Sequence, residues 1–324
     1  MSNLVFAYLG NFTAKTELGE RFNTESGISD TLTAMGHKCI ELQENVVSLP
    51  DILQATRGAD VFLWTKTAQW LKCNGFEMLS RIKIPTVGIH LDRWFGLSRE
   101  GEVATSPFFQ CDYLFTADGD SDEKYKAAGV NHFWLNPGVL KSACYVAEPR
   151  PDLICDVGFV GSRSYHSEHY REKLIDWLAS NYRGFRLFGA NGDSWRGHAL
   201  NQVFASTKVM VGDSCFAGQC KNYTSDRLYE HLGRGACFCY PEIKGITEEF
   251  TDGLQLRLYQ AGNFQSLKRV IDDMLAMSNE RRNAMRRAAV SNAILCHTWE
   301  QRMNQLIQTL SRKENLSGIE YGGN

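Results

Sequence analysis

The sequence YTSDRLYEHLGRGACFCY, residues 223–240, predicts a loop, a short helix and a buried strand in succession. Its Thr-Ser-Asp run, residues 224–226, consists of residue types that favour the N-cap of a helix. Gly233 and Gly235 are typical of a helix end, because glycine readily adopts the left-handed backbone that closes a helix. Residues 236–240 are apolar without alternation, as in a strand that is covered on both faces.

The start of that predicted helix has the features of an anion site. A helix N-terminus presents unpaired backbone N–H groups and the positive end of the helix dipole, which suits a phosphate. Arg227 adds a planar cation that can bind a diphosphate through two hydrogen bonds. Glu230, one turn later, offers a carboxylate to a pair of sugar hydroxyls. The stretch is therefore a candidate for half of a nucleotide-sugar site, and its candidate donor-binding residues are Tyr223, Thr224, Ser225, Asp226, Arg227 and Glu230.

The composition is that of an ordinary globular protein. The chain has 324 residues, of which 43% are hydrophobic and 22% charged, and its formal net charge is −2. Two domains of usual size fit this length, and the charge gives no overall basic field for nucleic acid or anionic lipid. Ten cysteines are scattered without zinc-ligand spacing. We therefore expect reduced thiols, no metal site, no cofactor and a cytoplasmic location.

Neither an export signal nor a membrane span is expected. The apolar run at residues 4–9 is too short for the core of a signal peptide and reads as a first strand. No apolar run approaches the ~20 residues that cross a bilayer.

Short apolar runs alternate with helical patterns in both halves, which predicts parallel sheets with helices on both faces. In the first half the expected strands are 4–9, 39–42, 61–64, 86–90, 113–116 and 132–135, and the expected helices are 28–35, 52–56, 76–82 and 122–128. In the second half the expected strands are 157–160, 186–188, 209–211, 236–240 and 254–258, and the expected helices are 170–179, 199–205, 225–232, 264–275, 280–294 and 298–310.

This alternation pauses at Pro137-Gly138, and residues 145–153 contain two prolines and little periodicity. We therefore expect two doubly wound α/β domains, residues 1–148 and 149–297, followed by a last helix and a frayed tail in residues 298–324. Ligands of such sheets bind outside the carboxyl ends of the strands. Candidate site residues are therefore expected in the loops that follow strands.

Two such loops in the first domain carry candidates. Gly10 and Asn11 follow the first strand and would approach a donor phosphate or sugar, although a plain turn explains them equally well. His90 and Asp92 follow the strand PTVGIH and are the candidate catalytic residues, because an imidazole exchanges protons near neutral pH and a carboxylate beside it orients the ring. A structural histidine bonded to backbone is the alternative. The carboxylates of residues 118–122 are interpreted as a helix cap rather than a cation site.

The second domain adds two further loops. Gly161, Ser162 and Arg163 follow its first strand and suit an anion, with a plain turn bearing surface arginines as the alternative. Gly189 follows the next strand and is a weaker candidate for contact with a nucleobase. The arginines of residues 281–287 are interpreted as a solvated helix face rather than a polyanion patch.

With these motifs in place, the chain resembles the GT-B glycosyltransferases, and within them the CgeB-like group of bacteria and tailed phages. In the second half the resemblance rests on VGFVGS (157–162), RGHALNQVFASTKVMVGDS (196–214), YTSDRLYEHLGRGACFCYP (223–241), GITEEFTDGLQLRLY (245–259) and HTWEQRM (297–303). In the first half it rests on TESGISDTLTAMGH (24–37), VGIHLD (87–92), YLFTADGD (113–120) and WLNPG (134–138).

The resemblance implies two Rossmann-like domains facing a central cleft, with the donor bound mainly to the second domain and the acceptor mainly to the first. It assigns Glu230 to the ribose, the backbone amides of residues 224–226 to the diphosphate and Arg227 to the role of cation. Many retaining relatives carry a glutamate near the transferred sugar where this chain has Asn222, so the stereochemical outcome stays open.

Two further features follow from the same resemblance. His90 resembles the histidine that contacts the transferred sugar in retaining relatives, whereas in an inverting relative His90 or Asp92 would deprotonate the acceptor. The last helix, from about Thr298, would pack back on the first domain.

The sequence thus predicts a metal-independent glycosyltransferase that moves a sugar from a nucleotide diphosphate sugar to a hydroxyl acceptor. A phage-type DNA glycosyltransferase acting on a hydroxymethylated base is an alternative within the same class. A nucleotide-sugar epimerase is another enzyme with this plan, and a two-lobed small-molecule-binding protein is the non-catalytic alternative. The sugar, the nucleobase and the acceptor (small molecule, protein, glycan or modified DNA) stay open.

Overall fold

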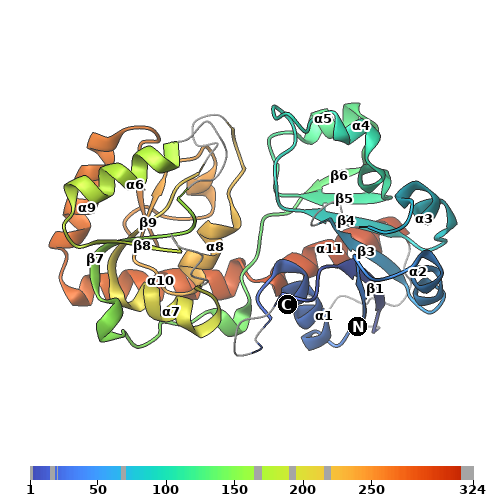
Figure 1. The fold of residues 1–324 in the computed structure, drawn as a ribbon, viewed down its shortest axis with the longest axis horizontal. Coiled ribbons are helices and arrows are strands. Elements are labelled where there is room, and N and C mark those ends of the chain that lie inside the picture. Colours follow the sequence, from blue (N-terminus) through green and yellow to red (C-terminus); the bar gives the residue numbers. More distant parts are fainter. Residues whose placement is uncertain are drawn as a thin grey trace. The chain divides into compact units, whose positions relative to one another are not determined.

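The computed structural model describes residues 3–14, 19, 21–66, 71–163, 170–189, 195–214 and 220–314, and the structural statements below concern these residues. The chain forms two compact units (Figure 1). Unit 1 comprises residues 1–136 and 299–324, and unit 2 comprises residues 137–298. Each unit contains a parallel sheet with helices, which confirms the predicted α/β class.

Unit 1 has a six-stranded sheet in the order β2-β1-β3-β4-β5-β6, and every neighbouring pair is parallel. Its strands are β1 (Val5–Gly10), β2 (Lys38–Gln43), β3 (Val61–Thr65), β4 (Thr86–His90), β5 (Tyr113–Thr116) and β6 (His132–Trp134). Its helices are α1 (Thr24–Ala34), α2 (Leu49–Thr56), α3 (Gly75–Arg81), α4 (Glu102–Thr105), α5 (Asp122–Ala127) and α11 (Trp299–Glu314), with a 3₁₀ turn, η1, at Pro107–Gln110.

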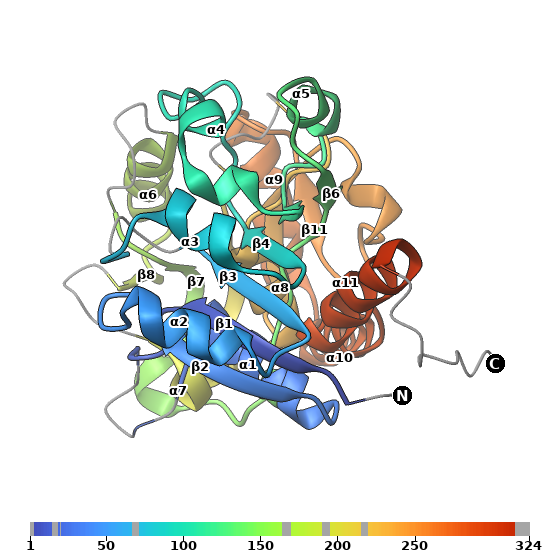
Figure 2. The ribbon, with the colours of Figure 1, turned by 90° about the vertical axis from the view of Figure 1, so that its right-hand side faces the viewer.

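Strand β1 shows why this sheet is covered on both faces. Ala7 and Leu9 belong to a core that also holds Ile52 of α2 and Met78 of α3, and Figure 2 shows these two helices lying over the strands. Tyr8 points to the opposite face and is also fully buried. Helix α11, the last of the described helices, packs against α1.

Unit 2 has a five-stranded parallel sheet in the order β11-β10-β9-β7-β8. Its strands are β7 (Cys155–Val160), β8 (Phe185–Phe188), β9 (Thr207–Val211), β10 (Phe238–Pro241) and β11 (Arg257–Tyr259). Its helices are α6 (Tyr170–Asn181), α7 (Gly197–Ser206), α8 (Asp226–Gly233), α9 (Phe264–Ala276) and α10 (Asn279–Cys296), with 3₁₀ turns η2 (Lys141–Ala143), η3 (Pro151–Leu153) and η4 (Ile246–Glu248).

Two separate cores cover the faces of this second sheet. Phe204 of α7, Leu228 of α8 and Phe238 of β10 belong to the core on one face. Phe159 of β7 and Ile271 of α9 belong to the core on the other. Both faces of the sheet are therefore shielded, which explains why its strands lack polar alternation.

Two local predictions are wrong. The expected strand 254–258 begins only at Arg257, because Leu254 lies in a turn and is 50% exposed. Of the four arginines in residues 281–287, Arg281 and Arg287 are exposed as predicted, but Arg282 and Arg286 are buried. Arg282 donates to the carbonyl of Met277 at 2.5 Å, just after α9. Their hydrogen bonds to helix-end carbonyls explain how two cations are tolerated in the interior.

Candidate functional site

The site of unit 2 is built around the first turn of α8. Ser225 is its N-cap residue, in an extended backbone conformation, and the Ser225 side chain makes no capping hydrogen bond. The N–H of Arg227 donates instead to Oδ1 of Asp226 at 2.8 Å. One amide of the turn is therefore engaged by a side chain, while the helix still directs the positive end of its dipole toward this loop.

Arg227 belongs to a buried cluster of three charges. Asp213 follows β9 and binds two guanidinium groups, that of Arg227 and that of Arg171 on α6. The Arg171 Nε to Asp213 Oδ2 distance is 2.7 Å. Both guanidinium groups also lie against the ring of Phe159, at 5.8 Å and 5.5 Å from its centroid. The cluster therefore brings two guanidinium groups and one carboxylate to the start of α8.

Gly161 and Arg227 are brought together. Gly161, directly after β7, has a φ of +140°, and a Cβ added there would lie 3.1 Å from Nη2 of Arg227. A side chain at this position would shift the guanidinium group by a few tenths of an ångström, and the positive φ is one that other residues rarely adopt, so glycine suits this position. Gly189, after the neighbouring β8, also has a positive φ, +99°.

Arg163 has a different position from the one expected. It pairs with Asp176 of α6, and both side chains are about half exposed. Ser162 is exposed as well. Of the three residues predicted after β7, Gly161 is therefore the one that the structure places against Arg227.

Glu230 is held in place one turn along α8. Its Oε2 accepts a hydrogen bond from Arg234 Nε. Nη1 of Arg234 donates to Asn201 Oδ1 at 2.8 Å, and Asn201 in turn donates to the carbonyl of Ala143 at 2.9 Å. This series of hydrogen bonds fixes one oxygen of the Glu230 carboxylate.

The loop before α8 is anchored by a second set of contacts. The hydroxyl of buried Thr224 lies 3.0 Å from that of Tyr229, which also donates to Glu249 at 3.0 Å. Tyr223 is buried, and Asn222 adopts a positive φ of +52°. The backbone N–H of Asn222 donates to the carbonyl of Lys244 at 2.9 Å. The loop therefore has a defined conformation rather than an open one.

In unit 1, His90 lies at the carboxyl end of β4, opposite Thr116 of β5. Its Nδ1 accepts a hydrogen bond from the backbone N–H of Asp92 at 3.0 Å. The Asp92 carboxylate, which was expected to orient the ring, lies 3.4 Å from Arg99 instead. The imidazole is packed edge-on against Trp94, with the ring centroids 5.0 Å apart.

Burial and charge make His90 a neutral group. Burial lowers the pKa of His90 to about 4, and the cations Arg99 and Lys66 act in the same direction, while Asp92 opposes them. Since Nδ1 accepts a hydrogen bond, the proton of the neutral ring is on Nε2. His90 is therefore a hydrogen-bond donor at neutral pH and a poor proton acceptor.

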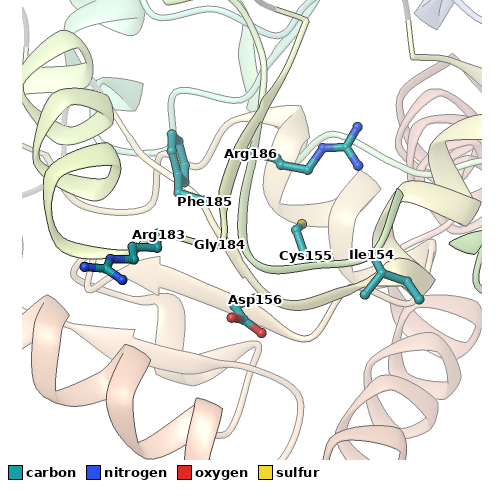
Figure 3. A pocket seen from close by; sticks show the side chains of 7 residues that line it. All are labelled: Ile154, Cys155, Asp156, Arg183, Gly184, Phe185 and Arg186. Atoms are coloured by element: carbon teal, nitrogen blue, oxygen red, sulfur yellow. The ribbon is translucent and has the colours of Figure 1, made fainter. Parts of the chain in front are cut away.

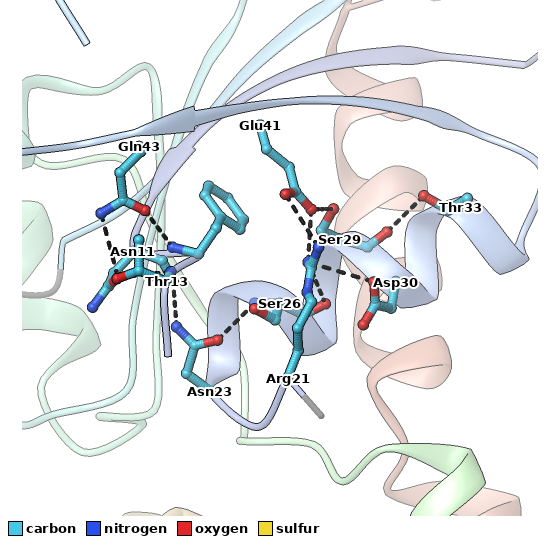
Figure 4. A network of polar contacts seen from close by, with 11 residues as sticks. Asn11, Thr13, Arg21, Asn23, Ser26, Ser29, Asp30, Thr33, Glu41 and Gln43 are labelled. Atoms are coloured by element: carbon cyan, nitrogen blue, oxygen red, sulfur yellow. Dashed lines mark hydrogen bonds and ion pairs between the residues drawn. The ribbon is translucent and has the colours of Figure 1, made fainter. Parts of the chain in front are cut away.

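Figure 4 shows the loop after β1, which Asn11 holds together by accepting several hydrogen bonds. Its Oδ1 accepts from Thr13 N at 3.2 Å and from Gln43 Nε2 at 3.3 Å, and its carbonyl accepts from Asn23. Gly10, the last residue of β1, precedes it. The side-chain oxygen of Asn11 is therefore committed to holding the loop.

Unit 2 also has a surface depression outside this candidate site. A depression of about 410 Å³ is lined by Ile154, Cys155, Asp156, Arg183, Gly184, Phe185 and Arg186 (Figure 3). These residues lie at the amino ends of β7 and β8, whereas the loops described above leave the carboxyl ends. Among the described residues, no group of three or more His, Cys, Asp or Glu side chains is arranged to hold a metal ion.

The described helices include none that is both long and apolar enough to cross a membrane.

Sequence comparison identifies one family. Residues 168–308 match the model of a family described as glycosyl transferase-like. No curated protein matches the chain.

Solved structures with the same fold cover nearly the whole chain. A glycosyltransferase from Rickettsia africae is 10% identical, covers 98% of this chain and 100% of its own, and has a TM-score of 0.63. HepE from Anabaena, solved with UDP and glucose, is 13% identical over 96% and 100%, with a TM-score of 0.62. An alpha-glucosyltransferase solved with UDP-glucose and DNA is 8% identical over 95% and 99%, with a TM-score of 0.70. The chain therefore has the fold of the GT-B glycosyltransferases, and its residues 168–308 match the glycosyl transferase-like family.

Proposed function

We propose that this protein is a glycosyltransferase that moves a sugar from a nucleotide diphosphate sugar to a hydroxyl acceptor without a metal ion. The observation that carries the proposal is the cluster of Arg171, Asp213 and Arg227 at the first turn of α8. The family match over residues 168–308 includes all three residues and supports the same assignment.

The cluster suits the charge that develops during transfer. As the bond between the sugar and the diphosphate breaks, negative charge grows on the leaving phosphate oxygens. A preorganised cation and helix dipole stabilise that charge with little reorganisation, which is the role that a metal ion has in other enzymes. Asp213 holds the guanidinium group of Arg227 in one orientation before the donor binds.

Glu230 is proposed as the residue that binds the ribose. Arg234 fixes the carboxylate through Oε2, and the hydrogen bonds seen among the described residues leave Oε1 to accept from a sugar hydroxyl. Tyr223, Thr224, Ser225 and Gly161 would complete the donor site, and Gly189 would adjoin the nucleobase. In unit 1, we assign His90 the role of a donor of a hydrogen bond through Nε2 rather than that of a base.

The charge around His90 favours a neutral acceptor over a polyanion. Among the described residues, three cations near His90 pair with a carboxylate: Lys66 with Glu102 at 2.9 Å, Arg99 with Asp92 at 3.4 Å and Arg93 with Asp118 at 3.9 Å. Nucleic-acid binding depends on unpaired lysine and arginine charge that can neutralise phosphates. The DNA alternative is therefore less well supported than a neutral hydroxyl acceptor.

A panel of UDP-, GDP-, ADP- and dTDP-sugars tests the proposal in two steps. A sugar nucleotide that binds the folded state raises the melting temperature, by an amount that grows with its concentration above Kd. We expect at least one member of the panel to do so, and to release its nucleoside diphosphate on incubation with the protein. Binding without release would favour a non-catalytic binding protein, and the absence of both would exclude the proposed donor site.

A further inference from the structure

A buried carboxyl group lies at the carboxyl end of β1, outside the residues assigned so far. Glu25 is in the first turn of α1, is 2% exposed, and has an Oε1 atom that is buried without a hydrogen-bond partner. A Cβ added to Gly10 would lie 2.8 Å from Cγ of Glu25. The side chain of Glu25 therefore packs directly on the end of the first strand, and the lack of a side chain at Gly10 makes room for it.

Other polar groups converge on the same place. The hydroxyls of Tyr8 on β1 and Thr65 on β3 are 2.8 Å apart. Glu44, directly after β2, is buried, and its N–H donates to the carbonyl of Gly10 at 3.0 Å. The sheet order β2-β1-β3 makes this the point where strand order reverses. Ligands of doubly wound sheets bind at the carboxyl ends of the strands at such a point.

The surroundings of Glu25 tune its proton affinity. Burial raises the pKa of Glu25 to about 7; its own backbone N–H opposes the shift, and the negative charge of Glu44 adds to it. Tyr8 is the second titratable group that interacts with the carboxyl group. The described part of α11, which packs on α1, contributes no charge that shifts it. A carboxylate with this property is suited to accept a proton at neutral pH.

We propose that Glu25 is the general base of the transfer and takes the proton of the acceptor hydroxyl at the carboxyl end of β1. The inference rests on the proposed function. In the step, the acceptor oxygen bonds to the anomeric carbon, and the bond from that carbon to the diphosphate breaks with its electron pair on the phosphate. The acceptor proton moves to Glu25 and then to solvent. His90 does not fill this role, because its ring nitrogen Nδ1 is engaged by the Asp92 N–H.

The same geometry indicates the class of acceptor. The carboxyl group of Glu25 is buried, and in its ionised form it repels an anionic group. The hydroxyls of Tyr8 and Thr65 offer both donors and acceptors to a polyol. The acceptor group is therefore a hydroxyl on an uncharged moiety, such as a sugar or an alcohol.

The test compares the wild-type protein with Glu25→Gln, using UDP-glucose as donor and water as acceptor. UDP release is measured from pH 5.5 to pH 9. Below pH 7 Glu25 is protonated and accepts no proton, so the wild-type rate falls about tenfold per pH unit as the pH drops and levels off above pH 7. We expect Glu25→Gln to slow release by at least ~10²-fold, the usual contribution of a general base, and to lose this pH dependence. Glu25→Asp, which retains a carboxylate, should restore part of this pH dependence.

A matched control is Glu123→Gln. Glu123 also occupies the first turn of a helix of unit 1, α5, but its side chain is 88% exposed. UDP release by this variant should match the wild type at every pH.

A second readout does not depend on activity. A glutamate whose pKa is raised on folding destabilises the protein as the pH increases from about 4.5 to about 7, because only the unfolded state ionises freely. The melting temperature of Glu25→Gln relative to wild type should therefore rise between pH 5 and pH 7 and then remain constant. A flat difference would overturn the assignment.

The two proposals fail in different ways. If Glu25→Gln binds UDP-glucose and releases UDP at the wild-type rate, the base is not Glu25, while the proposed transfer stands. If the wild type neither binds nor cleaves any sugar nucleotide of the panel, the proposed function fails, and the role of Glu25 fails with it.

Discussion

At the scale of single residues, Arg227 is the side chain on which the proposed donor site most depends. It is one of the two cations that pair with Asp213, the other being Arg171. Replacing Arg227 with alanine should slow UDP release from UDP-glucose on the order of 10²-fold, as expected for loss of one group that stabilises developing charge. Steady-state kinetics at saturating donor measure this effect as a loss of kcat.

Arg183→Ala is the control for that substitution. Arg183 is an exposed arginine of the same unit, but it lies by the amino end of β8 rather than at a carboxyl end. Its removal should leave kcat unchanged. Arg227→Lys separates charge from shape, because lysine keeps the charge and loses the paired hydrogen bonds. Unaltered turnover in Arg227→Ala would remove this residue from the site.

The sequence pattern indicates Arg227 as a site residue but does not reveal the residues that hold it. The pattern around Ser225 predicts an anion-binding helix start, and Arg227 follows from it. The partners of Arg227 do not, because Asp213 is 14 residues away and Arg171 is a further 42 residues from Asp213 along the chain. A contact between side chains on separate elements leaves no periodic signal. The same limit hid the burial of Glu25, which has the appearance of an ordinary acid in the first turn of a helix.

At the scale of elements, Arg286 joins α10 to the end of α7. Its Nη2 donates to the carbonyls of Thr207 at 2.6 Å and of Phe204 at 3.3 Å. Replacing Arg286 with methionine keeps much of the volume but removes both hydrogen bonds, while the Phe204 carbonyl still accepts one from the Thr207 N–H. A hydrogen bond to a charged group contributes about 1.5–3 kcal/mol, so we expect the free energy of unfolding to fall by about 2 kcal/mol in urea denaturation.

Arg287→Met provides the comparison, since Arg287 is the next residue of α10 and is exposed. Surface substitutions of this kind usually change stability by less than ~0.5 kcal/mol. Equal stability of the two variants would mean that the Arg286 hydrogen bonds contribute nothing to unit 2.

Elements whose apolar residues repeat regularly were predicted closely, and the strand Thr86–His90 was predicted to the residue. The edge strand β11 was not, because its three residues give too short a pattern to separate from the turn before it. Arg282 and Arg286 of α10 were misread because a charged side chain can be buried when helix-end carbonyls accept its hydrogen bonds. Such partners come from other elements and are not visible in the helix's own pattern.

At the scale of the whole molecule, the α/β class follows from uniformly apolar strands alternating with helices. The division into units depends on contacts that cross the sequence. Residues 299–314 belong with the first 136 residues rather than with the 162 that directly precede them. Within α11, Trp299, Met303, Leu306 and Leu310 are buried. They recur every three or four residues, so they form one apolar stripe on the helix.

The last prediction concerns a shortened protein that ends at Thr298 and therefore lacks this stripe. Burial of a large apolar side chain contributes roughly 1.5–3 kcal/mol, so the four residues of the stripe contribute about as much as the total stability of a typical domain. Unit 1 should then fail to fold, while unit 2, whose sheet and both cores lie within residues 137–298, should still melt cooperatively. Calorimetry would show one transition belonging to unit 2. The graded form of the test is Leu306→Ala, expected to cost about 2–5 kcal/mol, against Gln308→Ala on the exposed side of α11. Two intact transitions in the shortened protein would show that unit 1 does not need α11.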